Sequence, residues 1–261
     1  MIAEVAAAAL AVIWAGRHEE DDAVLSGRRR EPGGGADESG RSRARPAPVP
    51  GTPAAPTGLH PLELEPGRDG LLYVPDGDRA GRLAPLVLML HGAGGHAQMV
   101  VPLLQPLADA TGLILLVPDS RRQTWDVIRG GYGPDVAFID RALDRVFGRY
   151  AVDPTHVAIG GFSDGASYAL SLGLTNGDLF THVLAFSPGF LAPGEPRGWP
   201  RVFIAHGQKD EVLPIDHCSR RIVPRLQRAD YDVRYREFDG PHTVPPEIAL
   251  DALTWFTTDP S

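Results

Sequence analysis

The sequence predicts an α/β fold with a mostly parallel central sheet and helices on both of its faces. Short, almost continuously apolar segments alternate with longer segments whose apolar residues recur at helical spacing. Strands that are buried on both faces have this unbroken apolar character, and intervening helices connect parallel neighbours. The expected strands are Leu71–Val74, Leu86–Leu90, Leu113–Val117, His156–Gly160, Val183–Phe186, Val202–Ala205 and Val233–Phe238. The expected helices are Gln98–Thr111, Asp135–Arg149, Asp164–Leu174, Ile215–Ala229 and Pro246–Phe256.

The length of 261 residues suits one such domain with additional sequence before it. We expect the domain to occupy residues 59–261 and an N-terminal extension to occupy residues 1–58. Within the extension, Ile2–Gly16 is apolar enough for a short helix but too short to span a bilayer. It contains Glu4 and lacks a basic start, so it is a poor secretory signal, and a cytoplasmic location is expected. Gly27–Gly58 is rich in Pro, Gly, Arg and Ser, which predicts a disordered linker.

Charge and cysteine content exclude several classes of protein. The net charge of −8 argues against a nucleic-acid partner. The single cysteine, Cys218, cannot form an internal disulfide, and its place in an expected helix favours a structural thiol over a nucleophile. Lys209 is the only lysine, and no phosphate-binding loop of the P-loop type surrounds it.

The pentapeptide Gly161-Phe162-Ser163-Asp164-Gly165 joins an expected strand to an expected helix. Glycines at both ends permit a sharp turn, which would hold the Ser163 hydroxyl exposed at its tip. A serine placed in this way is a candidate nucleophile once a base and an orienting acid accompany it. The alternative is a glycine-rich turn with an incidental serine.

Two polar loops that follow later strands supply the candidate acid and base. Asp210 comes after the strand that ends at Ala205, and His242 comes after the strand that ends at Phe238. Catalytic groups gather at the carboxyl ends of strands in open α/β sheets. The order Ser163, Asp210, His242 is the one typical of a serine nucleophile on a strand-to-helix turn.

Other acidic and histidine residues fit these roles less well. Asp216 is better placed as a helix N-terminal residue, Asp239 lies too close to His242 in the chain, and Asp119 precedes the serine. His206 is the main alternative base because it too lies in a loop at a strand end. By contrast, His156 and His182 open strands, where solvated or satisfied edge positions are expected.

A glycine-rich turn, His91-Gly92-Ala93-Gly94-Gly95, follows the fully apolar strand Leu86–Leu90. Backbone N–H groups in such a turn can stabilise a developing negative charge. We expect the N–H groups of Ala93 and Asp164 to form an oxyanion hole, with Gly94 as the alternative to Ala93. A plain strand-to-helix connection is the alternative for the whole turn.

With these pieces in order, the chain resembles the phospholipase/carboxylesterase group of α/β-hydrolases, which includes acyl-protein thioesterases. The resemblance extends from about Leu59 to Phe256 and rests on His91–Gly95, Ile159–Ala166, Ala205–Pro214 and Gly240–His242. Thioesterase-like members usually carry glutamine where this chain has Asp164. A carboxylate there disfavours an oxyanion, so the Asp164 side chain is expected to point aside.

The resemblance implies a serine carboxylesterase that cleaves short- to medium-chain esters through an acyl-enzyme, with a small-molecule ester as its partner and without metal or organic cofactor. A lysophospholipase or acyl thioesterase is the alternative, and a non-catalytic binding protein on the same fold is a third possibility. The connection Gly189–Trp199 is short and predicts no substantial lid. Trp125, Phe190 and Leu191 follow strands and are candidate walls of the substrate pocket, although Trp125 is equally suited to packing a long loop.

Overall fold

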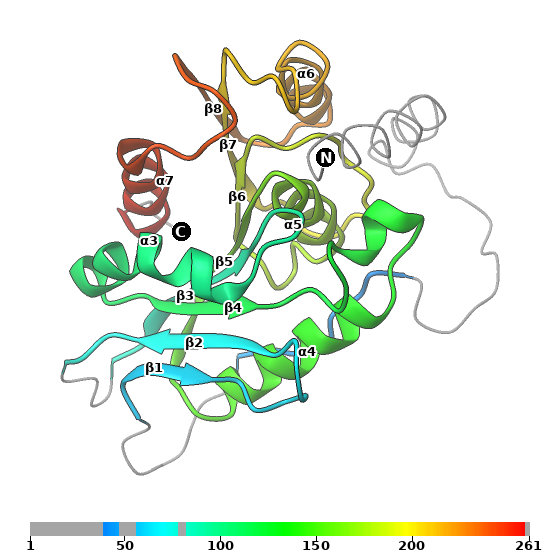
Figure 1. The fold of residues 1–261 in the computed structure, drawn as a ribbon. Coiled ribbons are helices and arrows are strands. Elements are labelled where there is room, and N and C mark those ends of the chain that lie inside the picture. Colours follow the sequence, from blue (N-terminus) through cyan, green and yellow to red (C-terminus); the bar gives the residue numbers. More distant parts are fainter. Residues whose placement is uncertain (1–38, 47–55, 78–81, 259–261) are drawn as a thin grey trace.

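The computed structural model describes residues 39–46, 56–77 and 82–258. Their centre is an eight-stranded sheet with the order β1-β2-β4-β3-β5-β6-β7-β8 (Figure 1). The pairs β1–β2 and β2–β4 are antiparallel, and every later neighbour is parallel. The strands are β1 (Gly58–Pro61), β2 (Gly70–Val74), β3 (Ala84–Leu90), β4 (Ile114–Pro118), β5 (Val152–Phe162), β6 (His182–Phe186), β7 (Arg201–Gly207) and β8 (Val233–Phe238).

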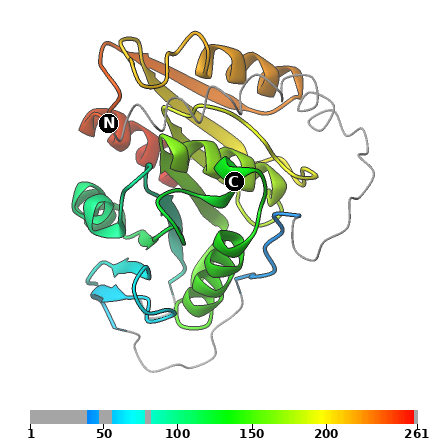
Figure 2. The same ribbon diagram turned by 45° about the vertical axis from the view of Figure 1, so that its right-hand side comes forward.

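Helices cover both faces of this sheet, which confirms the predicted fold class (Figures 1 and 2). One face carries α3 (Ala97–Thr111) and α7 (Pro246–Thr258), and the other carries α4 (Pro134–Phe147), α5 (Asp164–Thr175) and α6 (Ser219–Arg228). A short 3₁₀ helix, η1 (Asp126–Arg129), precedes α4. No helix in the described part of the chain is long and apolar enough to cross a membrane.

The alternation of side chains along β3 explains the two apolar cores. Leu86, Leu88 and Leu90 join the core beneath α4 and α5, whereas Val87 and Met89 join the core beneath α3 and α7. All five are buried because successive side chains of a strand point to opposite faces and both faces are covered. The unbroken apolar runs in the sequence therefore identify central strands correctly.

Three elements differ from the sequence-based expectations. The strand β1 is additional, since its four residues include no apolar run and alternate between half-buried and exposed. The strand β5 begins at Val152 and includes Pro154, whose missing N–H is tolerated because β6 pairs with β5 only from Ala158 onward. The helix α6 begins at Ser219 and not at the expected Ile215, since residues 215–218 form turns.

Residues 39–46 lie within the expected disordered linker but pack against the domain. Ser42 and Ala44 are buried. The Ser42 N–H donates to Asn176 Oδ1 at 2.8 Å, and Arg41 pairs with Asp178 at 2.9 Å. The prediction of disorder is therefore wrong for this segment, because hydrogen bonds to specific side chains hold it in place. The helix expected at Ile2–Gly16 lies outside the described residues.

Candidate active site

Ser163 occupies a strained backbone position between β5 and α5. Its φ of 58° and ψ of −120° are rare for a residue with a side chain, and such conformations cost of order 1–3 kcal/mol. The turn is fixed on both sides: the Ser163 N–H donates to Phe186 O at 2.9 Å, and the Ser163 carbonyl accepts from the Ala166 N–H at 3.0 Å. This geometry directs the side chain away from the strand and toward the carboxyl end of the sheet.

The glycines around this turn are required by close approach. A Cβ atom on Gly165 would lie 2.4 Å from the Leu90 carbonyl oxygen, so only glycine lets α5 begin so near the end of β3. Gly92 follows β3, and a Cβ atom built there would lie 3.4 Å from the Cβ of Ser163. The glycine-rich loop is therefore in direct contact with the serine.

The structure brings the three predicted catalytic residues together. The His242 Nε2 lies 2.9 Å from Ser163 Oγ, and the His242 Nδ1 lies 2.6 Å from Asp210 Oδ2. A carboxylate can only accept, so Nδ1 carries the proton and Nε2 accepts from the Ser163 hydroxyl. The loops that hold Asp210 and His242 touch, because a Cβ atom on Gly207 would lie 2.4 Å from the Gly240 carbonyl oxygen.

Asp210 is buried and accepts a hydrogen bond at each available position. Its Oδ1 accepts from the N–H groups of Val212 at 3.0 Å and Leu213 at 2.7 Å. Its Oδ2 faces His206 Nε2 at 3.2 Å as well as His242. Burial alone raises the pKa of Asp210, but the donors from His206 and His242 outweigh it and hold this pKa well below its usual range. The carboxylate thus stays ionised beside the imidazole.

His206, the rival base in the sequence, supports Asp210 instead. Its ring is fully buried, with Nδ1 at 2.6 Å from Ser219 Oγ and Nε2 at 2.8 Å from the Leu213 carbonyl oxygen. Because Nε2 faces only acceptors, it carries the proton, and the Ser219 hydroxyl donates to Nδ1. Sequence reasoning missed this contact, although the four-residue spacing between His206 and Asp210 around one strand-end loop was its signal.

The predicted oxyanion donors lie on either side of the serine. The N–H groups of Ala93 and Asp164 make no hydrogen bond within the described residues, whereas the Gly94 N–H donates to Gln123 O at 2.6 Å. The alternative donor Gly94 is thus occupied. Among the described residues, the N–H of Ala93 on the glycine-rich loop and the N–H of Asp164 at the start of α5 therefore remain available as donors.

The Asp164 carboxylate is held by another side chain. Its Oδ2 accepts a hydrogen bond from Thr124 Oγ1 at 2.6 Å, and the residue is buried. Burial is the main cause that raises the pKa of Asp164. The carboxylate beside the serine is therefore held by Thr124, in surroundings that disfavour its charged form.

Two of the three candidate pocket residues belong to the core. Trp125 is fully buried, donates from Nε1 to the His91 carbonyl oxygen at 2.9 Å and stacks on Tyr168 with ring centroids 5.3 Å apart. Leu191 is buried as well. Their assignment as pocket walls is wrong, because no face of either is left for a ligand. Phe190 is half-buried and remains a candidate.

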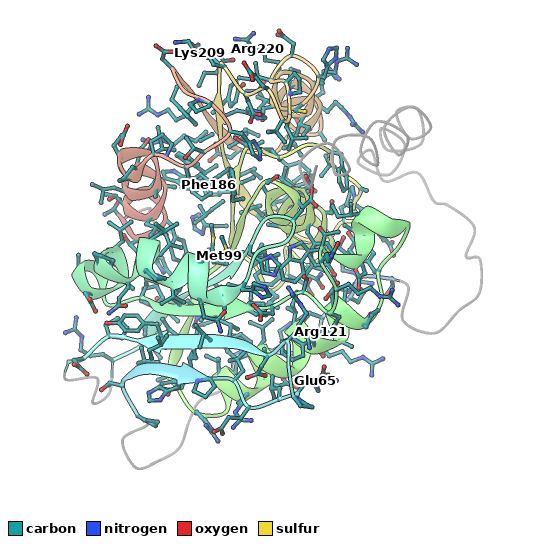
Figure 3. The ribbon with its side chains drawn as sticks, in the orientation of Figure 1. Glu65, Met99, Arg121, Phe186, Lys209 and Arg220 are labelled. Atoms are coloured by element: carbon teal, nitrogen blue, oxygen red, sulfur yellow. The ribbon has the colours of Figure 1, made fainter. Side chains whose placement is uncertain are left out.

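The remaining acidic candidates have other partners. Asp119 accepts from the Ala97 N–H at 2.7 Å at the start of α3. Asp239 pairs with Lys209 at 2.5 Å at the surface, and Asp216 pairs with Arg220 at 2.8 Å. Lys209 and Arg220 lie beside β8 and α6, at the opposite end of the molecule from Glu65 and Arg121 (Figure 3).

Within the described ranges, no group of three or more His, Cys, Asp and Glu side chains is placed to hold a metal ion.

Known proteins share this architecture. The chain is 30% identical over 204 residues to the NocK protein of Nocardia uniformis subsp. tsuyamanensis, which is named as an esterase, covering 67% of this chain and 59% of that protein. It is 30% identical over 175 residues to feruloyl esterase C of Emericella nidulans, covering 64% of each. The chain thus spans less than two thirds of the length of these curated relatives.

A solved structure, esterase PE8, superimposes with a TM-score of 0.59 at 23% identity, covering 71% of this chain and 96% of that chain. Residues 136–254, which include all three members of the Ser163–His242–Asp210 arrangement, match the Phospholipase/Carboxylesterase family. The strand-to-helix serine, the sheet order and this match over residues 136–254 are those of the phospholipase/carboxylesterase family of α/β-hydrolases.

Proposed function

We propose that this protein is a serine hydrolase that cleaves carboxylic esters through an acyl-enzyme. The observation that carries the proposal is the position of His242. Its Nε2 lies 2.9 Å from Ser163 Oγ, and its Nδ1 lies 2.6 Å from Asp210 Oδ2. A base within hydrogen-bond reach of a hydroxyl, itself oriented by a carboxylate, is the arrangement that activates a serine.

In the acylation step, Ser163 Oγ forms a bond to the ester carbonyl carbon while its proton passes to His242 Nε2. The carbonyl oxygen becomes an oxyanion and accepts from the Ala93 and Asp164 N–H groups, each worth about 3–4 kcal/mol in the transition state. The carbon–oxygen bond to the alcohol then breaks, and the alcohol leaves with the proton from His242. Asp210 stabilises the imidazolium throughout and keeps its own charge.

In the deacylation step, a water molecule gives a proton to His242 Nε2 and its oxygen attacks the acyl carbon. The bond between the acyl carbon and Ser163 Oγ breaks, the serine recovers its proton and the carboxylic acid is released. Every proton transfer uses the same nitrogen, which requires no movement of Asp210.

Short to medium acyl groups form the proposed substrate range. The cavity beside the glycine-rich loop is lined by Arg68, Arg122, Gln123 and Thr124. A lysophospholipase or long-chain thioesterase needs a long apolar channel instead. The relative named feruloyl esterase C supports the inclusion of feruloyl esters among the candidates.

The test is a substrate panel of p-nitrophenyl acetate, butyrate, octanoate and palmitate, a butyryl thioester and methyl ferulate. We expect turnover of the shorter esters, and a loss of about 10⁴-fold or more in kcat for Ser163→Ala with an unchanged circular dichroism spectrum. Labelling with a fluorophosphonate should modify the wild type and spare the variant. Full activity of Ser163→Ala, or a wild type that neither turns over an ester nor reacts with the probe, would refute the proposal.

A further inference from the structure

A second feature near Ser163 is a cavity of about 560 Å³ lined by Arg68, Arg122, Gln123 and Thr124. Arg68 comes from the loop between β1 and β2, and the other three come from the loop that follows β4. We call this space the arginine cavity.

Residues that line the arginine cavity hydrogen-bond to neighbours of the catalytic groups at two places. Thr124 donates to the carboxylate of Asp164, the residue next to Ser163, at 2.6 Å. Gln123 accepts from the Gly94 N–H at 2.6 Å, and Arg68 Nη2 donates to the Gly95 carbonyl oxygen at 3.1 Å. The cavity is thus tied both to the nucleophile turn and to the loop that offers the Ala93 N–H.

Its positive charge is not neutralised. The guanidinium of Arg122 makes no hydrogen bond or ion pair with any described residue. Arg68 donates from Nε and Nη2 only to the neutral oxygens of Ser120 and Gly95. Among the described residues, none of those that line the cavity is a carboxylate, and the nearby Asp164 carboxylate is buried and accepts from Thr124.

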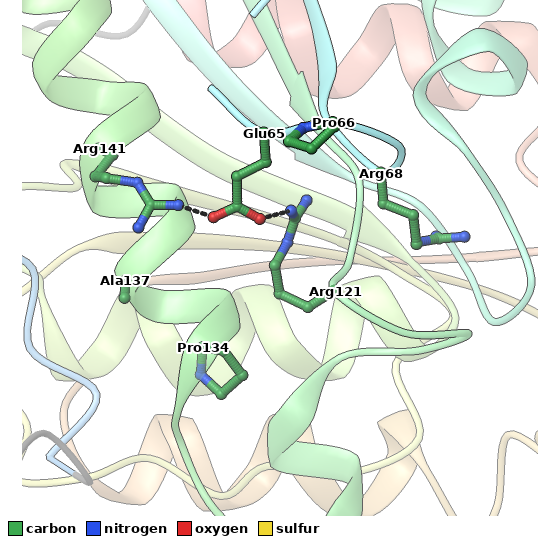
Figure 4. A pocket seen from close by; sticks show the side chains of 7 residues that line it. All are labelled: Glu65, Pro66, Arg68, Arg121, Pro134, Ala137 and Arg141. Atoms are coloured by element: carbon green, nitrogen blue, oxygen red, sulfur yellow. Dashed lines mark hydrogen bonds and ion pairs between the residues drawn. The ribbon is translucent and has the colours of Figure 1, made fainter. Parts of the chain in front are cut away.

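The neighbouring cavity, of about 410 Å³, shows the opposite arrangement. There Glu65 lies between Arg121 and Arg141, which both donate to its carboxylate, while the guanidinium of Arg68 points away from this cluster (Figure 4). Glu65 occupies the place that an anion would take in that cavity. The arginine cavity has the same kind of cation and lacks such an internal anion.

The order of the strands indicates which part of an ester reaches the arginine cavity. Strands β3 and β4 lie on one side of β5, and β7 and β8 lie on the other. The leaving alcohol takes its proton from His242, which follows β8, so the alcohol belongs on that side. The arginine cavity follows β4 and therefore faces the acyl group.

We propose that the arginine cavity binds a carboxylate at the far end of the acyl group, so that half-esters of short dicarboxylic acids are preferred substrates. The inference rests on the proposed esterase function of Ser163. The guanidinium of Arg122 supplies the main unpaired charge, and Arg68 supplies a second that is held in place by Ser120 and Gly95.

The experiment compares two p-nitrophenyl esters with acyl chains of equal length, the neutral valerate and the glutarate half-ester with a free terminal carboxylate. For Arg122→Gln we expect kcat/KM for the glutarate to fall about tenfold, because a hydrogen bond to a charged group is stronger than one between neutral groups and exposure to solvent reduces the gain. The valerate should change less than about twofold. Arg122→Lys should fall between wild type and Arg122→Gln, and added salt should reduce the glutarate preference of the wild type.

Arg228→Gln is the matched control, because Arg228 is exposed on α6 and has no partner among the described residues. It should leave the ratio of the two kcat/KM values unchanged. If wild type hydrolyses the valerate and Arg122→Gln keeps the wild-type ratio, the inference is wrong while the esterase proposal stands. An enzyme that hydrolyses neither ester contradicts the esterase proposal itself. A preference found only for a carboxylate on the alcohol side also overturns the assignment to the acyl group.

Discussion

His206 and His182 lie on neighbouring parallel strands, one near the carboxyl end of its strand and the other at the amino end, and both are buried. His206, near the carboxyl end of β7, has hydrogen-bond partners at both ring nitrogens and contacts Asp210. His182, at the amino end of β6, packs its ring against Trp255 and Phe256, each with centroids 5.1 Å apart. The same side chain thus supports a catalytic carboxylate at one end and fills an aromatic cluster at the other.

Burial therefore does not by itself mark a functional histidine. Loops at the carboxyl ends of parallel strands converge on one site, so a buried polar group there meets other polar groups. At the amino end of β6, His182 pairs in register with Arg201, and burial followed by this positive charge lowers the pKa of His182 to about 4. His182 is not solvated, because α7 covers it, but its Nδ1 lies 2.9 Å from Thr181 Oγ1, as expected for a hydrogen-bonded histidine at the start of a strand.

The greatest loss of activity is expected for a substitution of Asp210, which lies at the centre of the hydrogen-bonded groups at the carboxyl ends of the strands. Asp210→Asn keeps the shape of the side chain but presents an amide where His242 needs an acceptor, which favours the wrong tautomer. We expect kcat on p-nitrophenyl butyrate to fall about 10⁴-fold. Glu211→Gln, one residue along the same loop, is the control and should retain activity. Near-normal turnover by Asp210→Asn would mean that Asp210 does not orient the base.

The second prediction concerns His182, at the amino end of β6, and the quantity measured is the free energy of unfolding. His182 has a folded-state pKa of about 4, below its unfolded value near 6.5, so the unfolded state binds more protons between these pH values. Stability is therefore lost as pH falls from about 6.5 to 4, by about 3 kcal/mol at pH 4 relative to pH 7.

His182→Leu removes this proton uptake, while all other titrating groups stay in place. Urea unfolding at several pH values should show the difference in unfolding free energy between wild type and His182→Leu shifting by about 3 kcal/mol over this range. Leu59→Ala, at an exposed position on β1, removes no titrating group and provides the comparison, which should show no such shift. A constant difference between wild type and His182→Leu at all pH values would contradict the assignment.

A smaller loss of activity is expected for substitutions of His206, and it tests whether His206 positions Asp210. Removing its Nε2–H in His206→Leu deprives Asp210 of one donor, and we expect kcat/KM to fall about 10- to 100-fold. Asp210 would then hold protonated His242 more strongly, so the acid limb of the pH profile should move to higher pH. His206→Gln places an amide N–H near the same position and should recover both readouts in part. If the two variants lose activity equally and neither changes the pH profile, the role of His206 is packing alone.

The sequence was sufficient for the features that rest on apolar periodicity and on loops following strands. Unbroken apolar runs such as Leu86–Leu90 can only be buried on both faces, so they locate the central strands. Ser163 and Asp210 follow two such strands, whereas His242 follows β8, in which apolar and charged residues alternate. Parallel strands bring their carboxyl ends to one edge of the sheet.

Features that rest on specific tertiary contacts were not predictable in this way. The strand β1 has no apolar run, since it is held at the edge by backbone pairing to β2. Trp125 follows a strand as a pocket residue would, yet a hydrogen bond to His91 and stacking on Tyr168 draw it into the core. The contact between His206 and Asp210 depends on how one loop curves, which no local pattern reports.

The packed segment 39–46 also sets where a recombinant protein should begin. Asn176 donates from Nδ2 to the Gly40 carbonyl oxygen at 2.8 Å, and Asp140 Oδ1 accepts from the N–H groups of Arg43 at 2.7 Å and Ala44 at 2.9 Å. A chain shortened to start at Leu59, the expected start of the domain, would strip these side chains of their partners and uncover the surface that Ala44 buries. An expression boundary upstream of Ser39 keeps the folded unit whole.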